Sequence, residues 1–169
     1  CGKVFNLIPY GTETMHLLRA EKGYIVIGQE TDGTVTPIDL NYNWMIGKNK
    51  KDFIGKRSLS RPDTRRNDRK QLVGLSPVNK SDKIEEGQHI VEINKLPKKI
   101  IDPIKYLGHV SSSYHSPNLK QSIGLAMIKG GNNLIGQKFF VTASGKTQNI
   151  PVEVVNPVFI DPENKRLTS

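Results

Sequence analysis

The residues best able to do chemistry gather in a polar loop, Gln29–Thr34, which holds one amide, two carboxylates and two hydroxyls. The loop follows the apolar run Tyr24–Gly28, which predicts a short buried strand. Carboxylates and amides at a strand end can hold a heterocycle that bears paired N–H and C=O groups. Alternatively, Asp32 and Gly33 form a purely structural Asx-type turn. The turn is the favoured interpretation for Asp32, whereas both interpretations stay open for Gln29 and Glu30.

A second polar and aromatic cluster lies between residues 106 and 116. Its members are Tyr106, His109, Ser111–Ser113, Tyr114, His115 and Ser116. Rings and hydroxyls beside a helix start can meet an anion or a ring system. Alternatively, Ser116 only caps the next turn, which is favoured, and Tyr114 only covers a barrel end, which stays open. Tyr42 and Trp44 pose a choice between core and ligand wall, with the core favoured.

Other kinds of site have little support. The four histidines have no partners at zinc-ligand spacing, so we expect no metal. Cys1 is the only cysteine, and nothing near it in the sequence activates its thiol. The glycines do not follow the strand-to-helix pattern of a phosphate-binding or dinucleotide-binding loop.

Most of the net charge of +9 lies in residues 48–70, where ten cations face three anions. Such a block attracts nucleic acid, an anionic membrane or an acidic small molecule, or is simply a solvated linker. No apolar run approaches the ~20 residues of a membrane-spanning helix, so we expect no membrane segment. The lone cysteine excludes a disulfide framework and suits a cytoplasmic protein. The chain lacks an initiator Met and opens like the interior of a folded protein, which indicates a fragment of a longer polypeptide.

The pattern of elements predicts an α+β chain in two parts. We expect a helix over residues 12–22, capped by Thr12 and ended by Gly23, with Met15, Leu17 and Leu18 packed on a sheet. A second helix is expected over 52–59, capped by Asp52. Five β-rich runs then predict a small barrel or sandwich: 71–75, 89–93, 105–111, 137–143 and 152–155. One helical turn interrupts them, with Ser116 as N-cap and Pro117 at the first position.

Three ordered segments resemble the aminomethyltransferase family, which includes the glycine cleavage T-protein. Residues 11–59, with LLRAEKGYIVIGQETDGTVTP at their centre, resemble the end of the family's folate-binding portion. Residues 108–128 (GHVSSSYHSPNLKQSIGLAMI) resemble the signature of its C-terminal β-barrel, and residues 152–167 (VEVVNPVFIDPENKRL) its last strand and tail. Within the family, the first segment is most similar to alpha subunits of heterotetrameric sarcosine oxidases.

The resemblance implies a remnant of an α/β folate-binding domain at residues 1–65 and a small antiparallel β-barrel domain at 66–169. It also implies capture of the imine from sarcosine oxidation by tetrahydrofolate, which gives 5,10-methylenetetrahydrofolate. FAD, FMN and NAD would belong to the parent complex and not to this segment. The implied partners are the N-terminal remainder of the same subunit, a flavin-bearing beta subunit and the smaller subunits of a heterotetramer.

The resemblance also assigns roles to individual residues. It implies folate contacts for Gln29, Glu30, Thr36, Trp44 and Tyr114, and a structural ion-pair role for Arg19 and Glu21. It implies no catalytic residue in this chain, because the family's carboxylate near folate N10 lies upstream, so the segment alone is expected to be inactive. Met15 and Ile27 stand where many glycine-cleavage members carry an arginine and a tyrosine.

Two alternative functions stay open. The chain could serve a glycine-cleavage or dimethylglycine dehydrogenase type of aminomethyltransferase, which differs in its partner proteins. A basic β-barrel that binds nucleic acid through residues 48–70 is disfavoured, because aromatic residues do not alternate with the cations as a base-stacking surface requires. No nucleic-acid partner is therefore expected.

Overall fold

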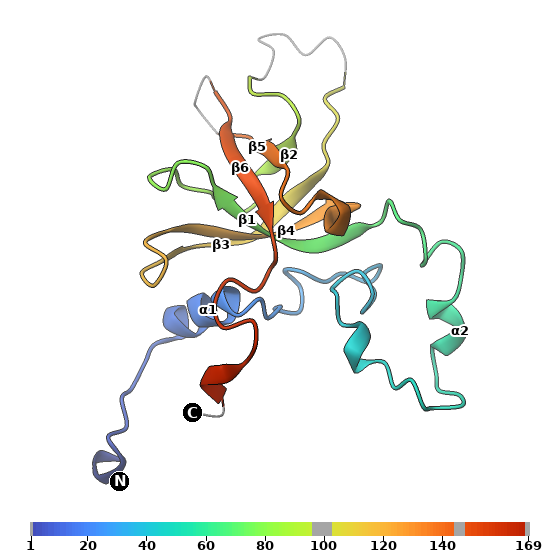
Figure 1. Ribbon diagram of the computed structural model, residues 1–169, viewed down its shortest axis with the longest axis horizontal. Helices are drawn as coiled ribbons and strands as arrows, with labels where there is room; N and C mark the ends of the chain where they lie inside the picture. The colour runs from blue at the N-terminus through green and yellow to red at the C-terminus, as the bar shows by residue number, and fades with distance from the viewer. Residues whose placement is uncertain (1, 96–102, 144–147, 168–169) are drawn as a thin grey trace.

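A closed barrel of six antiparallel strands forms the body of the protein (Figure 1). The computed structural model describes residues 2–95, 103–143 and 148–167. The strands follow the order β1-β4-β3-β2-β5-β6 around the barrel. Their bounds are β1 Lys70–Pro77, β2 His89–Val91, β3 Gly108–Ser116, β4 Gln121–Lys129, β5 Lys138–Val141 and β6 Ile150–Val155. This closed sheet confirms the predicted barrel and the α+β class.

The barrel carries apolar side chains on its inner face and, on one side, on its outer face as well. In β1, Val73 and Leu75 point into the barrel core, whereas Leu72 belongs to a second cluster outside it. In β4, Ala126 and Ile128 point inward, and Leu125 and Met127 outward. Because successive side chains of a strand alternate between faces, a strand covered on both faces is apolar throughout.

The segment before the barrel covers this apolar outer face. Its helix α1 (Thr12–Glu21) contacts β3 and β4, and Figure 1 shows the helix beneath β3. Ala20 and Leu40 complete the outer core cluster with the outward residues of β1 and β4. The other helices are short: η1 Lys3–Phe5, η2 Asn43–Met45, α2 Lys56–Leu59, η3 Gly131–Leu134 and η4 Lys165–Leu167. Among the helices of the described residues, none has both the length and the apolarity needed to cross a bilayer.

The tail after β6 returns to the same helix. The backbone N–H groups of Phe159 and Ile160 both donate to the carbonyl of Glu21, at 2.9 Å. Lys22 forms an ion pair with Asp161, with 3.1 Å between Nζ and Oδ2. The helix is therefore held between the barrel wall and the C-terminal tail.

Several predicted elements need correction. Residues 24–28 form no strand. Ile27 makes an isolated bridge to Thr31, and Ile27 is 82% exposed, so it is not buried as predicted. Strand β4 was missed, because its continuous apolar run lacks the alternation of a half-buried strand. The predicted helical turn after Ser116 is instead the reversal between β3 and β4, where the Ser116 hydroxyl accepts the N–H of Leu119 at 3.1 Å. Ser116 therefore does cap a turn, as its favoured interpretation holds.

The helix ends also differ in detail. Helix α1 was predicted almost to its bounds, and Gly23 adopts a left-handed φ of 73°, but the N-cap is Gly11 and not Thr12. Met15 and Leu18 are about half exposed and Leu17 is partly buried, whereas the buried residues of the helix are Ala20 and Glu21, so the predicted packing is wrong for Met15 and Leu18. Helix α2 begins at Lys56 with Gly55 as its N-cap, so the predicted cap by Asp52 is wrong; the Asp52 carboxylate accepts the N–H of Phe53. The domain boundary at 65/66 stays a prediction; the first barrel strand begins at Lys70.

Gly108 provides a test of the barrel's packing. A Cβ at this position would lie 2.0 Å from the carbonyl oxygen of Met127 and 2.9 Å from the Cα of Ile128, both backbone atoms of β4. We expect Gly108→Ala to lower the free energy of unfolding by about 3 kcal/mol, because the strands must separate to admit the methyl group. Gly33→Ala is the control, since nothing lies within 4 Å of its Cβ position. Equal unfolding midpoints in denaturant titrations of the two variants would contradict this packing.

Candidate functional site

Arg19 links helix α1 to the polar loop and to the barrel. Its guanidinium donates to the Glu30 carboxylate at 3.0 Å, to Gln29 Oε1 at 2.7 Å and to the Ser112 hydroxyl at 2.7 Å. It also lies 5.7 Å from the ring centroid of Tyr114, a cation–π distance. The Arg19 Nε–H has no hydrogen-bond partner among the described residues. The predicted structural ion pair is therefore confirmed for Arg19, with Glu30 as its partner.

The Glu30 carboxylate is buried and fully engaged. Only 1% of the surface of Glu30 is exposed to solvent. One oxygen accepts from Arg19 and from the backbone N–H of Val26 at 2.8 Å, and the other accepts from Ser111 at 3.0 Å and Ser112 at 2.5 Å. A buried carboxylate is tolerable only when it is paired and hydrogen-bonded, and Glu30 meets both conditions.

A bulge in β3 lets two consecutive serines serve this one carboxylate. The pairing of β3 with β4 shifts register between Val110 and Ser112. Consecutive residues of a regular strand point to opposite faces, whereas a bulge can turn both toward one side. Ser111 and Ser112 thus both reach Glu30 from the outer wall of the barrel. The sequence analysis noted the serine run, but it did not predict that two of these hydroxyls donate to the Glu30 carboxylate.

Two further buried carboxylates reinforce the junction. Glu21, which is 3% exposed, accepts from the Ser116 hydroxyl at 2.5 Å and from the Asn118 amide at 2.9 Å. It forms hydrogen bonds instead of the predicted ion pair. Asp39, which is 2% exposed, accepts two hydrogen bonds from Arg69, at 2.9 and 2.8 Å.

The five predicted folate contacts do not meet in one cavity of the described structure. Gln29 and Glu30 line a cavity of about 460 Å³, called the Gln29 cavity here, whereas Trp44 lines another of about 720 Å³. Thr36 lines a third, of about 660 Å³, and its N–H and hydroxyl both donate to Asp39. Tyr114 lies against Arg19. Trp44 is 75% exposed and stacks edge-on with Tyr42, so the favoured core interpretation is wrong for Trp44.

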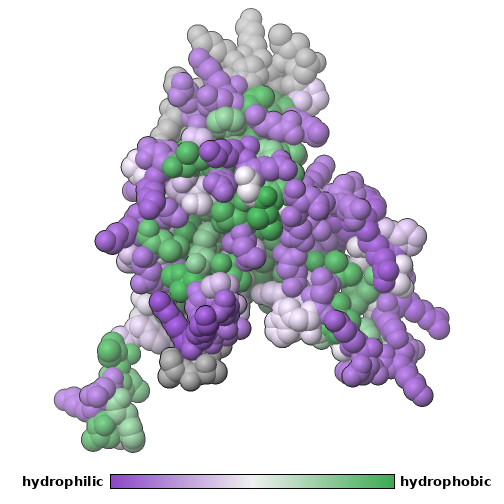
Figure 2. Space-filling view, in the orientation of Figure 1, coloured by the Kyte–Doolittle hydropathy of each residue, from purple (hydrophilic) through white to green (hydrophobic). Residues whose placement is uncertain are grey.

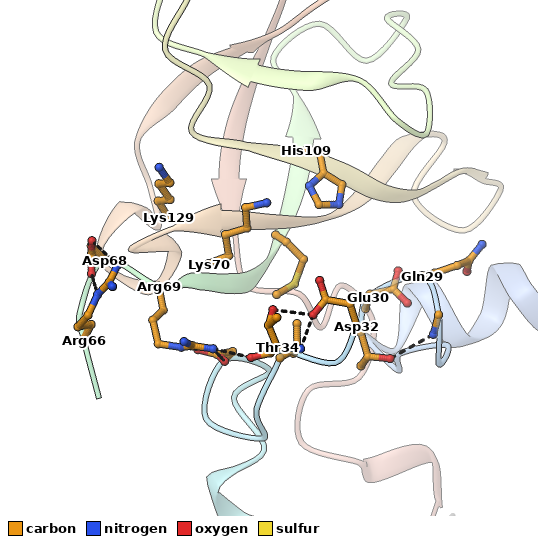
Figure 3. A pocket seen from close by; sticks show the side chains of 15 residues that line it. Gln29, Glu30, Asp32, Thr34, Arg66, Asp68, Arg69, Lys70, His109 and Lys129 are labelled. Carbon is orange, nitrogen blue, oxygen red and sulfur yellow. Dashed lines mark hydrogen bonds and ion pairs between the residues drawn. The ribbon is translucent and has the colours of Figure 1, made fainter. Parts of the chain in front are cut away.

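The Gln29 cavity lies between the polar loop and one end of the barrel wall, where β1 and β3 begin and β4 ends (Figure 3). The loop side contributes Gly28, Gln29, Glu30, Thr31, Asp32, Thr34, Val35 and Asp39. The barrel side contributes Arg66, Asp68, Arg69, Lys70, His109, Met127 and Lys129. An amide, carboxylates, a histidine and four cationic side chains thus surround one hollow of the size of a small-molecule site.

Asp32 and His109 face this cavity with shifted pKa values. The Asp32 carboxylate accepts the N–H and hydroxyl of Thr34, at 2.7 and 2.6 Å, and these hydrogen bonds lower its pKa below 3.8. The predicted Asx-type turn is confirmed by the same contacts. Burial, and after it the charge of Lys70 and the neighbouring His89, lower the pKa of His109 below 6.5. At neutral pH Asp32 is therefore ionised and His109 is uncharged.

Part of the basic segment is internally neutralised. Arg66 forms ion pairs with Asp63 and Asp68, and Arg69 with Asp39 and Asp63.

Among the described residues, no group of three or more His, Cys, Asp or Glu side chains is placed to hold a metal ion. The positions where the sequence departs from glycine-cleavage members, Met15 and Ile27, are both at the surface.

Comparison with known proteins places the chain in a family. Residues 70–161 match the glycine cleavage T-protein C-terminal barrel domain, and residues 1–50 match the GCVT N-terminal domain. The chain therefore belongs to the glycine cleavage T-protein family. A solved aminomethyltransferase T of the glycine cleavage system from Bartonella henselae has the same fold, with a TM-score of 0.69 at 21% identity over 86% of this chain and 38% of that one.

Within this family, the chain is similar to alpha subunits of sarcosine oxidase. It is 47% identical over 98% of its length to sarcosine oxidase subunit alpha of Corynebacterium sp. (strain U-96), and 36% identical to that of Rhizobium meliloti (strain 1021), again over 98%. The chain spans only 17% and 16% of these relatives' lengths. The relatives support an enzymatic role, in a family of oxidoreductase subunits and aminomethyltransferases.

The Arg19–Glu30 pair yields a stability prediction. We expect Arg19→Met to cost about 3–5 kcal/mol of unfolding free energy, because it leaves the Glu30 carboxylate buried without its cation. Adding Glu30→Gln removes the stranded charge, so the double variant should cost less than the sum of the single changes by about 1–3 kcal/mol. Denaturant unfolding of the four proteins measures this coupling. Strictly additive costs would contradict a direct charge pairing.

The Asp39–Arg69 pair yields a pH prediction. Burial tends to raise the pKa of Asp39, but hydrogen bonds from Arg69 and Thr36 outweigh it and hold the pKa below 3.8. The stabilisation is therefore present above pH 3.8 and is lost as the pH falls through the lower pKa of the folded state. We expect Asp39→Asn to flatten the dependence of unfolding free energy on pH below about pH 4. Parallel curves for both proteins in that range would contradict the lowered pKa.

Proposed function

We propose that the chain is part of a sarcosine oxidase alpha subunit and serves tetrahydrofolate-dependent one-carbon transfer. The imine from oxidative demethylation of sarcosine would be captured as 5,10-methylenetetrahydrofolate. Two findings support this reading: the match to the T-protein family, and 47% identity over nearly the whole chain to a sarcosine oxidase alpha subunit. The aminomethyltransferase of Thermosipho melanesiensis is 31% identical over 75% of the chain, which favours the sarcosine oxidase branch over the glycine-cleavage branch.

The observation that carries the proposal is the Gln29 cavity beside the Arg19–Glu30 pair. Its volume of about 460 Å³ suits one small molecule. Gln29 Oε1 accepts a hydrogen bond from Arg19, and Gln29 Nε2 makes no hydrogen bond to the described residues, so an N–H donor is free for the acceptor edge of a heterocycle. Cations at the barrel side suit the carboxylates of a folate. The residues present therefore fit a reduced folate.

In this proposal Gln29 and Glu30 have different roles. Gln29 touches the folate, and Glu30 holds Arg19 and the loop in place, because its own oxygens are already engaged by four donors. Folate supplies the acceptor for the one-carbon unit. The folate contact implied for Glu30 stays a prediction. So do those of Thr36, Trp44 and Tyr114, which lie outside the Gln29 cavity.

The remaining machinery is proposed to lie outside this chain. The acid/base carboxylate belongs to the N-terminal remainder of the subunit, and FAD, FMN and NAD belong to other parts of a heterotetramer that includes a flavin-bearing beta subunit. We propose a cytoplasmic assembly. Enclosing the imine between subunits would limit its hydrolysis by bulk water.

The free Gln29 amide gives the functional test, made in the full-length subunit assembled with its partners. Gln29→Glu keeps the oxygen that accepts from Arg19 but removes the N–H donor, and Gln29→Ala removes both. We expect both variants to bind tetrahydrofolate about threefold to tenfold more weakly, and to form less 5,10-methylenetetrahydrofolate per sarcosine oxidised. The rate of sarcosine oxidation itself should be unchanged.

Gln137→Ala, an exposed glutamine outside the cavity, is the matched control. Unchanged folate affinity in both Gln29 variants would overturn the placement of the site. Absence of any tetrahydrofolate binding by the unaltered assembly would overturn the proposed function.

A further inference from the structure

The chain between helix η2 and strand β1 forms a lobe beside the barrel (Figure 1). The two family matches end at residue 50 and resume at residue 70, so residues 51–69 belong to neither matched domain. Helix α2 lies in this connecting segment, and none of its residues is buried. The connecting segment therefore presents a largely exposed surface.

A hollow of about 680 Å³ lies in this lobe and is called the basic hollow here. Its floor is apolar and partly buried, and consists of Ile38, Ile46, Phe53 and Leu59. Its rim is exposed and carries six cations: Lys48, Lys50, Lys51, Lys56, Arg57 and Arg65. In Figure 2 the lobe at the lower right, where Figure 1 places α2, is mainly hydrophilic around a small hydrophobic patch.

The rim cations of the basic hollow are not neutralised within the described residues. The ion pairs of the basic segment belong to Arg66 and Arg69, neither of which lines the hollow. Asp52 is the one carboxylate of the lining, so six cations and one anion leave a net charge of +5. Lys56 donates only to backbone carbonyls, those of Lys50 and Lys51.

The fold of the lobe distinguishes it from a solvated linker. A charged linker relaxes the repulsion between its like charges by extending. Here the chain is folded back by local hydrogen bonds: the Thr64 hydroxyl donates to the carbonyl of Ser58 at 2.8 Å, and the Ser60 hydroxyl to that of Arg57 at 2.9 Å. The like charges are therefore held around one hollow, and an anionic group that enters it relieves their repulsion.

The apolar floor indicates which kind of anion fits the basic hollow. Single-stranded nucleic acid binds through aromatic faces on which its bases stack, but Phe53 is the one aromatic side chain of the lining and is partly buried. An acidic protein segment offers carboxylates to the rim and aliphatic side chains to the floor. This combination of a charged rim and an apolar centre is typical of protein–protein interfaces.

We propose that the basic hollow docks an acidic segment of another subunit, with carboxylates at the rim and an apolar side chain on the floor. The inference rests on the multi-subunit assembly of the proposed function but not on its folate chemistry. Most of the lining lies beyond residue 50, outside the match to the N-terminal domain, so the remainder of that domain is not the expected occupant. Complementary charge speeds the encounter of the two subunits and sets their orientation.

The first experiment treats the full-length subunit, assembled with its partners, with a carbodiimide that joins an amine to a carboxylate in direct contact. Mass spectrometry of the digested assembly then identifies the carboxylates joined to the four rim lysines. We expect Asp or Glu residues of another subunit. Cross-links only to the N-terminal remainder of the same subunit, or no cross-link from these lysines, would overturn the docking surface.

The second experiment reverses two rim charges, with Lys51→Glu and Arg57→Glu in one variant. Their side chains make no hydrogen bond to the described residues, and only their backbone carbonyls accept side-chain donors, so the fold should be kept. Thermal unfolding verifies this. We expect the variant to bind the partner subunits about tenfold more weakly, mainly through slower association, and raised salt should reduce the difference.

Two further variants separate local charge from other effects. Lys51→Arg with Arg57→Lys keeps both charges and should bind the partner subunits as the unaltered subunit does. Lys80→Glu with Lys105→Glu is the matched control, because both lysines are exposed, lie outside the hollow and undergo the same change of charge. Unchanged affinity in the Lys51/Arg57 reversal, or equal weakening in the control, would overturn the docking surface.

Other occupants give results of their own. Binding of a single-stranded oligonucleotide or of phosphatidylserine vesicles to the unaltered assembly, lost in the Lys51/Arg57 reversal, would overturn the protein partner. A full-length subunit that associates with no other polypeptide would instead overturn the assembly in the proposed function, and the docking surface with it. Tetrahydrofolate binding tests the folate chemistry separately, so the failures are distinguishable.

Discussion

A buried carboxylate, Glu30, is the contact on which the arrangement of this structure depends. The cost of burying an ionised group is large unless a cation and hydrogen bonds compensate for it. Arg19 supplies the cation from helix α1, and Ser111 and Ser112 supply hydroxyls from the barrel. Because these donors come from distant parts of the sequence, the requirement to satisfy Glu30 fixes the helix, the loop and the barrel relative to one another.

This polar junction works together with an apolar one. The outward residues of β1 and β4 bury against Ala20 and Leu40, which gives attraction without strict direction. The Arg19–Glu30 pair adds direction, since its hydrogen bonds need one geometry. The polar loop is thereby held at the barrel wall, where the cavity forms. Paired arginines then leave Lys70 and Lys129 as the free cations among the described residues that line it.

The sequence allowed the barrel, helix α1 and the Asp32 turn to be predicted, because each has a local signal: β-rich runs between turns, a Gly23 stop and an Asx turn. It did not allow β4 to be found, since burial on both faces removes the alternation that marks a strand. The role of Glu30 was equally hidden, because two of its four partners, Ser111 and Ser112, lie some 80 residues away and meet it through a bulge. The dispersal of Trp44 and Thr36 into other cavities is likewise a property of tertiary packing.

Hydrogen exchange in the Glu30→Gln variant shows whether this carboxylate holds helix α1 and the polar loop to the barrel. If Glu30 holds the segment before the barrel in place, amides of α1 and of the loop that contains Val26 should lose protection. Amides of β1 and β4 within the barrel core should keep theirs, because their ladder does not depend on the carboxylate. Unchanged protection in α1, or an equal loss throughout the barrel, would contradict the account.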